Sequence, residues 1–253
     1  MLKNLRDRNQ RDIIIVIDDE FDRELRYNRD IRFSVPENKG VAILNIGKLD
    51  EISNELPEFI QIIKHLAKPG DILLRVPFEE YEYVKIEDAE YEIPQRKIEC
   101  VMTFCGLLGA KKATFIELVN TTKNTTLSFQ TDGSYRLFKG SINYEDEFLL
   151  KFSSNLKYQR EWKGNPKLDK AKQYMYEKGL IRESACKSLF EEVTYNPENL
   201  KIYRKEIQLT SELKTQLKIV AECKIPKIFN ISVDINSKYN EISDYKLVFE
   251  VCF

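Results

Sequence analysis

The sequence predicts an α+β fold, in which a mixed α/β lobe over residues 1–119 packs on a lobe over residues 120–253 that long antiparallel strands dominate. Two observations favour this fold. The first half alternates short apolar runs with helix-like stretches, and the second half carries longer runs in which apolar and polar residues alternate. A helical interlude is expected near residues 166–192. Because no Gly-, Ser- or Pro-rich linker separates the halves, we expect one cooperative unit.

Short runs rich in Ile and Val predict four strands in the first half, at residues 12–17, 41–46, 72–76 and 113–119. Apolar residues recur at helical spacing over residues 49–63, and Pro57 predicts that a fresh helix begins there. Another helix is expected from Pro94 to Leu108, because apolar residues line one side and Gly109 follows as a C-terminal stop. Together these elements predict a layered α/β arrangement.

The second half begins with strand-like runs, at residues 127–131, 135–140 and 148–158. Asn165 and Pro166 predict the capping residue and first turn of a helix that stops at Gly179, and a shorter helix follows at residues 183–192. Longer strands are expected after it, at residues 201–209, 213–223, 229–235 and 245–253. Residues 236–240 are polar and predict the tip that joins the last two strands.

The periodicity of these elements also predicts which side chains fill the core. We expect apolar side chains on the inner face of each strand and helix to be buried. These core positions are Ile14, Val16, Ile43, Leu56, Ile60, Ile63, Leu73, Val101, Leu108, Ile116, Leu149, Met175, Leu189, Leu217, Ile219, Leu247 and Phe249.

Composition narrows the classes of function. The chain holds 40 basic and 41 acidic residues, so its global charge indicates no polyanionic partner. No apolar run approaches the ~20 residues of a transmembrane helix, and the opening residues lack a secretory signal, so we expect a cytosolic chain. Five scattered cysteines indicate reduced thiols that behave as small hydrophobes. The single histidine, His65, is expected at a helix end or on the surface, which disfavours His-dependent catalysis and metal binding.

The stretch IIIVIDDE, residues 13–20, carries an apolar strand into Asp18, Asp19 and Glu20. Such a strand can deliver carboxylates to a Mg²⁺ site, as in a Mg-dependent hydrolase or nuclease. The further groups would then come from neighbouring strands, with Asp71, Glu117 and Lys111 as candidates. No phosphate-binding loop precedes the strand, and the third strand of a receiver-like arrangement runs into Pro77. The alternative is that the strand surfaces here and the acids cap a following helix.

A basic run with interleaved aromatic residues forms the second candidate site. Its members are Lys151, Lys157, Tyr158, Arg160, Trp162, Lys163 and Lys167. Aromatic and cationic side chains together can bind nucleic acid. They can also form the outer face of an element whose aromatic residues cover the core. A third interpretation pairs this run with the acidic segment at residues 79–92, within the chain or between subunits. A protein partner or self-association is favoured over nucleic acid.

Residues 213–223 alternate apolar and polar side chains, as the strands of a membrane barrel do. Strands placed around a helical segment resemble the element order of gasdermin-like domains. That resemblance implies a pore-forming effector stored in soluble form, which would dock on anionic membranes through the basic run. The sequence has one histidine, no phosphate-binding loop and no complete set of metal ligands. These absences favour instead a non-catalytic cytosolic binding or effector protein of unknown ligand. Mg²⁺ is the cofactor only under the hydrolase alternative.

Overall fold

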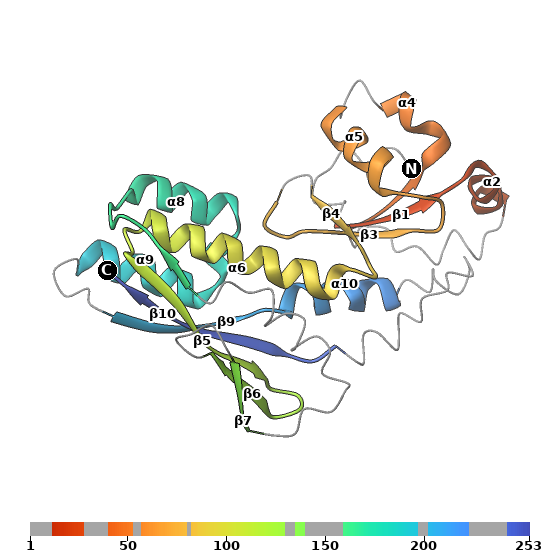
Figure 1. Ribbon diagram of the computed structural model, residues 1–253. Helices are drawn as coiled ribbons and strands as arrows, with labels where there is room; N and C mark the ends of the chain where they lie inside the picture. The colour runs from red at the N-terminus through yellow and green to blue at the C-terminus, as the bar shows by residue number, and fades with distance from the viewer. Residues whose placement is uncertain are drawn as a thin grey trace. The chain divides into compact units, whose positions relative to one another are not determined.

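The computed structural model describes residues 12–27, 40–52, 57–79, 82–129, 135–139, 159–196, 202–222 and 242–253. It has an α+β fold, which confirms the predicted class, with helices and two sheets (Figure 1). The described residues fall into two compact units. One is drawn from Met1–Glu92 and Glu212–Ile242, and the other from Ile93–Ser211 and Ser243–Phe253.

The first unit is built on a mixed four-stranded sheet in the order β2-β1-β3-β4. Its strands are β1 (Ile13–Ile17), β2 (Val41–Asn45), β3 (Ile72–Arg75) and β4 (Tyr83–Lys85). Strands β1 and β2 run parallel, whereas β3 is antiparallel to both β1 and β4. All five residues of β1 are buried, as the uninterrupted apolar run predicted for a strand covered on both faces.

Helices complete the core of the first unit. They are α2 (Asp19–Tyr27), α4 (Leu49–Ile52), α5 (Pro57–Leu66) and α10 (Ser211–Glu222), with the 3-10 turn η2 (Ile46–Lys48) before α4. The predicted helix start at Pro57 is confirmed. Buried apolar residues from α4, α5 and the strands form one cluster: Ile14, Val16, Ala42, Leu44, Leu49, Phe59, Ile60, Ile63, Ala67, Leu73 and Tyr83.

The strand predicted at residues 213–223 is wrong, because residues 211–222 form the helix α10. Leu213, Gln216, Leu217 and Val220 are buried, and this spacing is one stripe of an α-helix. Most other residues of the segment are good helix formers, so the apparent alternation concealed a helical period. Ile219 lies off the buried stripe and is half-buried, which corrects its assignment to the core.

The second unit contains an antiparallel sheet in the order β7-β6-β5-β10-β9, with β8 also paired to β5. Its strands are β5 (Lys112–Asn120), β6 (Thr125–Phe129), β7 (Tyr135–Lys139), β8 (Gln159–Glu161), β9 (Ile202–Gln208) and β10 (Tyr245–Cys252). Antiparallel pairing of the last described strands was predicted and is confirmed. Strand β5, which the sequence placed with the first lobe, pairs here with β10 along its whole length.

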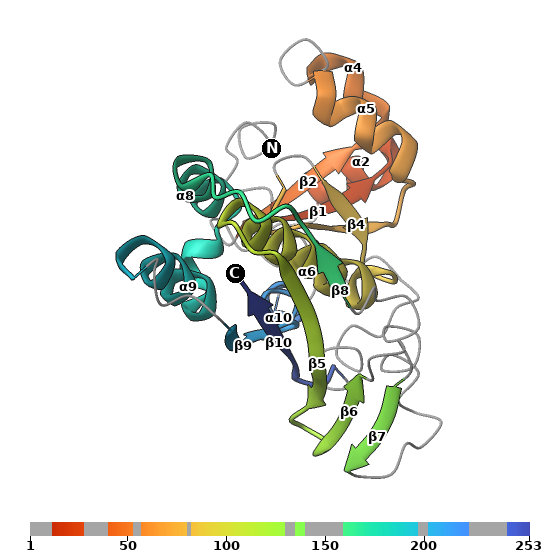
Figure 2. The ribbon, with the colours of Figure 1, turned by 60° about the vertical axis from the view of Figure 1, so that its left-hand side comes forward.

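Three helices of the second unit lie beside this sheet, as Figures 1 and 2 show. They are α6 (Ala89–Leu107), whose first residues belong to the other unit, α8 (Leu168–Glu177) and α9 (Ser184–Tyr195), with the 3-10 turn η3 (Leu180–Arg182) between the last two. Helix α6 begins five residues before the predicted start at Pro94, which lies inside its second turn. Helix α8 begins after Pro166 and has Lys167, not Asn165, at its N-cap.

A β-bulge corrects another predicted core residue. Val248 pairs with Glu117 and the next residue, Phe249, pairs with Phe115, so Ile116 has no partner in the register. The extra residue shifts which side chains of β5 face inward. Phe115 and Leu118 are buried, whereas Ile116 is half-buried. Leu56 and Leu149 lie outside the described residues, and apart from Ile116 and Ile219 every other predicted core residue is buried.

Residues 159–167 form a tight strap across the turn between α6 and β5. Trp162 packs on Gly106, where an added Cβ would lie 2.6 Å from the indole Nε1, and Pro166 packs on Gly109 in the same way. The backbone N–H groups of Trp162 and Lys167 donate to the carbonyls of Lys111 and Leu107, at 2.9 and 2.8 Å. The strap therefore closes by contact between backbone and ring, which only glycine permits.

Candidate functional site at the carboxyl ends of β1 and β2

The candidate site lies where two parallel strands end side by side. Ile17 and Asn45 are partners in the register of β1 and β2, so the residues that follow both strands meet at one edge of the sheet. Ligands of open α/β sheets bind at this edge, beyond the carboxyl ends of the strands. Asp18, Asp19 and Glu20 follow β1, and Gly47 and Lys48 follow β2.

Asp18, Asp19 and Glu20 are all exposed. Asp18 and Asp19 accept hydrogen bonds from different partners. Asp18 Oδ1 accepts a hydrogen bond from the backbone N–H of Phe21 at 2.8 Å, so Asp18 caps α2. Asp19 Oδ1 accepts a hydrogen bond from Asn45 Nδ2 at 2.8 Å and thereby joins the two strand ends. Asn45 also accepts from the Gly47 N–H at 2.8 Å. The predicted capping of a following helix is thus confirmed for Asp18.

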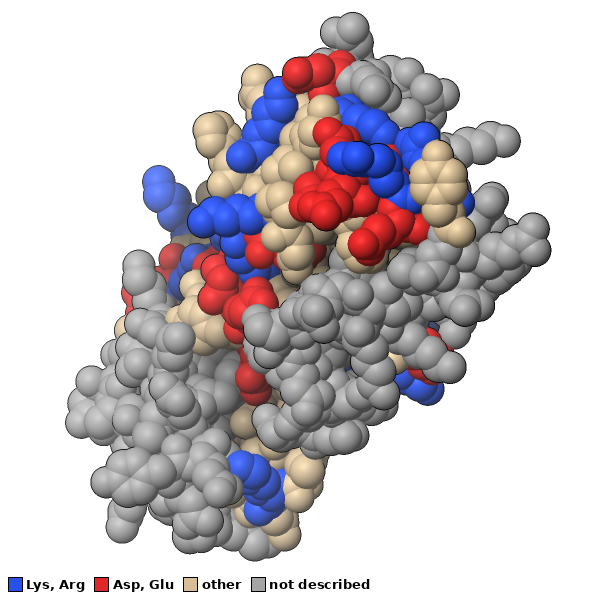
Figure 3. Space-filling view, turned by 90° about the vertical axis from the view of Figure 1, so that its right-hand side faces the viewer, with Lys and Arg blue, Asp and Glu red and all other residues tan. Residues whose placement is uncertain are grey.

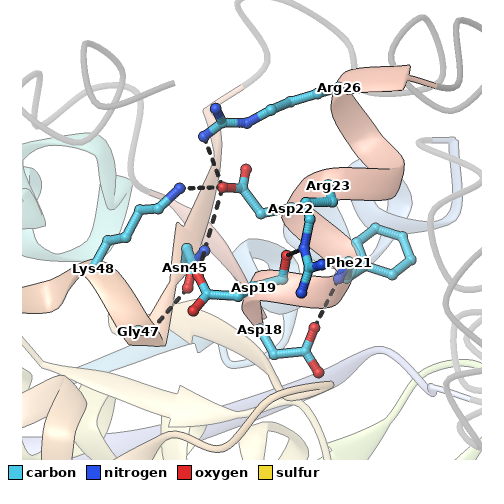
Figure 4. Close-up of polar contacts among 9 residues, drawn as sticks. All are labelled: Asp18, Asp19, Phe21, Asp22, Arg23, Arg26, Asn45, Gly47 and Lys48. Atoms are coloured by element: carbon cyan, nitrogen blue, oxygen red, sulfur yellow. Dashed lines mark hydrogen bonds and ion pairs between the residues drawn. The ribbon is translucent and has the colours of Figure 1, made fainter.

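The centre of the cluster is Asp22, which the sequence analysis did not single out. Its side chain is only 5% exposed, and its Oδ2 accepts from Arg26 Nη2 at 2.8 Å and from Asn45 Nδ2 at 3.3 Å. Lys48 forms an ion pair with the same oxygen. Figure 4 shows these three donors converging on one carboxylate oxygen. The network ties α2 to the residues after β2, so the exposed acids stand on a fixed support.

The pKa of Asp22 reflects this balance. Burial alone raises it, but the hydrogen bonds from Lys48, Arg26 and Asn45 outweigh burial and hold the pKa below its ordinary value. Asp22 therefore remains ionised at neutral pH and keeps both cations in place. A buried carboxylate with three donors on one oxygen is an anchor for the local structure. The other oxygen, Oδ1, is buried and has no hydrogen-bond partner among the described residues.

The two further acids weighed for a Mg²⁺ site both form ion pairs. Asp71 lies close to the end of β1, where its carbonyl accepts from the Val16 N–H at 3.0 Å, but its carboxylate pairs with Lys85 at 2.8 Å. Glu117 lies on β5 in the other unit and pairs with Arg204 at 3.0 Å. Within the described residues, no group of three or more His, Cys, Asp or Glu side chains is gathered as a metal site would require. The carboxylate next to Asp19 is that of Asp22, which shares the Asn45 amide with it and is itself paired with Lys48 and Arg26.

Figure 3 views the side of the molecule on which α2 lies. Acidic side chains gather there next to lysine and arginine side chains. On α2 the exposed charges are Asp19, Glu20, Arg23, Glu24 and Arg26. Acids at the first turn and Arg26 at the last turn also match the dipole of the helix.

The basic aromatic run is brought together only in part. Lys151, Lys157 and Tyr158 lie outside the described residues. Arg160, Lys163 and Lys167 are exposed, whereas Trp162 is half-buried against Gly106 in the strap. The position of Trp162 agrees with the interpretation in which an aromatic residue of this run covers the core.

The cysteines form a third group worth testing for chemistry. Cys100, Cys105 and Cys186 are buried free thiols in the second unit, and Cys252 is half-buried. Burial raises the pKa of Cys105 well above its ordinary value, and it raises the pKa of Cys186 to about 12 with help from the nearby Glu183 carboxylate. Because the thiolate is the reactive form, these two thiols are inert at neutral pH. The prediction that they behave as small hydrophobes is confirmed for the three buried ones.

Helix α10 removes one of the observations on which the pore-forming alternative rested. That alternative rested on an alternating strand at residues 213–223, which are helical up to Glu222, and on a pair of strands at residues 229–235 and 245–253 around the turn at residues 236–240. Residues 229–240 lie outside the described residues, whereas residues 245–252 form the strand β10. Among the described helices, none combines the length and the apolar composition that a bilayer crossing requires.

His65 is exposed in the last turn of α5, as expected.

Asp22, Asn45 and Lys48 are the site residues that the sequence analysis missed. A usable signal existed for Asn45 and Lys48. Two apolar strands joined by a helix-length segment tend to pair in parallel, and that tendency would have placed the polar residues at the end of the second strand near Asp18 and Asp19. Asp22 was harder to find, because its burial depends on partners from β2 that lie 23 or more residues away.

Comparisons of the chain with models of protein families, with curated proteins and with solved structures give no match.

Proposed function

We propose that this protein is a non-catalytic binding protein that recognises a positively charged segment of a partner protein at the carboxyl ends of β1 and β2. The observation that carries the proposal is the arrangement around Asp22. Its buried carboxylate holds Lys48, Arg26 and Asn45, and so fixes the support on which Asp18, Asp19 and Glu20 face solvent. Preorganised charges bind at a lower entropic cost than mobile ones. A cytoplasmic location fits the free buried thiols.

The roles of the individual groups favour binding over catalysis. A hydrolytic site needs a base, a metal or a nucleophile that is free to react with substrate. Here Asp18 caps a helix, Asp19 bonds Asn45, and the Lys48 ammonium is paired with Asp22. Each of these groups is therefore engaged in holding the edge of the sheet together, and in the contacts found among the described residues Asp18 and Asp19 each use Oδ1.

The chemistry of the exposed acids selects the kind of partner. Three consecutive carboxylates on one edge attract ammonium and guanidinium groups and repel phosphates. The arginines and Lys48 next to them add positive charges that would disfavour partners with a different spacing of cations. Surface charges of this kind raise the association rate and make binding sensitive to salt.

The proposal is tested with a fluorescently labelled oligolysine peptide as the probe, titrated with the purified chain at low and at high salt. Removing three exposed charges is expected to weaken binding about tenfold, since exposed ion pairs contribute up to about 1 kcal/mol each. The variant is D18N/D19N/E20Q, which keeps the side-chain shapes and the capping oxygen of residue 18. Binding of the parent should fall steeply as salt is raised.

A matched control removes three exposed acids from the other unit, in the variant D169N/E177Q/E191Q. It changes the net charge by the same amount, so a nonspecific charge effect would weaken both variants equally. The proposal requires the parent and the control to bind the peptide alike. Equal binding by all three proteins, or tighter binding of a DNA oligonucleotide than of the peptide, would contradict it.

A further inference from the structure

We draw no further inference here: the strongest candidate, the Ser188–Glu192–Lys205 cluster between α9 and β9, in which Lys205 Nζ lies 3.0 Å from Ser188 Oγ and 3.1 Å from Glu192 Oε1, carries nothing, because its hydrogen bonds join its own members and no contact among the described residues points to a ligand.

Discussion

Among the described residues, each unit of the molecule buries one charged side chain, and the partners that neutralise the two charges differ. Asp22 in the first unit is 3% exposed and lies at a polar edge, where two cations and an amide share its carboxylate. Lys97 in the second unit is fully buried within α6 and pairs with Glu183 at 2.5 Å. Glu183 stands between η3 and α9, so this pair ties the two helical segments to α6.

The two buried charges also differ in whether exposed acids lie next to them. The Lys97–Glu183 pair lies among helices and close to the buried thiol of Cys186, and both of its side chains are largely or fully buried. Asn45 connects Asp22 to the exposed Asp19, so the hydrogen bonds around Asp22 also fix the position of an acid at the surface. Burial of a charge is therefore not sufficient to indicate a site, and the exposed groups that it positions decide the matter.

The largest expected effect on stability comes from removing one partner of the Lys97–Glu183 ion pair. Lys97→Met leaves the Glu183 carboxylate, whose side chain is 16% exposed, without its cation. The free energy of unfolding should fall by about 3 kcal/mol, because an uncompensated charge stays largely buried. Chemical denaturation of the parent and the variant measures the difference.

The double variant K97M/E183M is the control for this prediction. Replacing both charges by apolar side chains of similar length should restore most of the lost stability. If the single variant were as stable as the parent, or the double variant less stable than the single, the assigned role of the pair would be wrong.

The next effect concerns the strap in the second unit. Gly106→Ala places a Cβ within 2.9 Å of three indole atoms of Trp162. Alanine is better than glycine inside a helix by about 1 kcal/mol, yet we expect a net loss of about 2 kcal/mol from the overlap. Denaturation gives the sign, and fluorescence of the chain's single tryptophan reports its displacement. A stabilised G106A variant with unchanged fluorescence would show that the strap does not close on Gly106.

The network around Asp22 predicts that the free energy of unfolding depends on pH. Because the folded pKa of Asp22 is lowered from 3.8, its contribution is present above that ordinary value and is lost as the pH falls through the folded pKa. Asp22→Asn should therefore cost about 1–2 kcal/mol at neutral pH and less in acid. Unfolding curves of both proteins at several pH values test this, and a difference that stays constant from neutral to acidic pH would contradict it.

The smallest expected effect is at the cap of α2. Asp18→Ala removes the acceptor of the Phe21 N–H and should cost about 1 kcal/mol. Asp18→Asn keeps an acceptor oxygen and should cost only a few tenths of that amount. Thermal unfolding of the two variants separates the cap from the charge. Equal losses in both would assign the effect to charge alone.

Continuous apolar runs made β1, β2 and β3 predictable from the sequence, whereas the short strand β4 of the same sheet was not predicted. Strand β1 and helix α5 were found because burial on two faces, or on one helical stripe, leaves a direct pattern. Helix α10 was missed because its apolar residues fit both a period of two and a period of 3.6. The bulge at Ile116 and the Trp162 contact depend on pairing between distant segments, which no local pattern encodes.

The candidate site was predicted only in its exposed part. Asp18 and Asp19 were visible because they follow a recognisable strand. Asp22 looked like one more acid on a polar helix, since its burial arises only when Lys48 and Asn45 approach from β2. The sequence thus located the edge of the sheet, whereas the three-dimensional pairing of β1 with β2 was needed to show what fixes it.

The central claim is that the acids at the end of β1 bind and do not catalyse. The most direct test incubates the parent chain and D18N/D19N/E20Q with Mg²⁺ and with nucleoside triphosphates, single-stranded and double-stranded nucleic acids in turn, and measures product formation. We expect no turnover above the buffer control in either protein. Mg²⁺-dependent hydrolysis by the parent that disappears in the folded variant would contradict the claim and establish a catalytic carboxylate site.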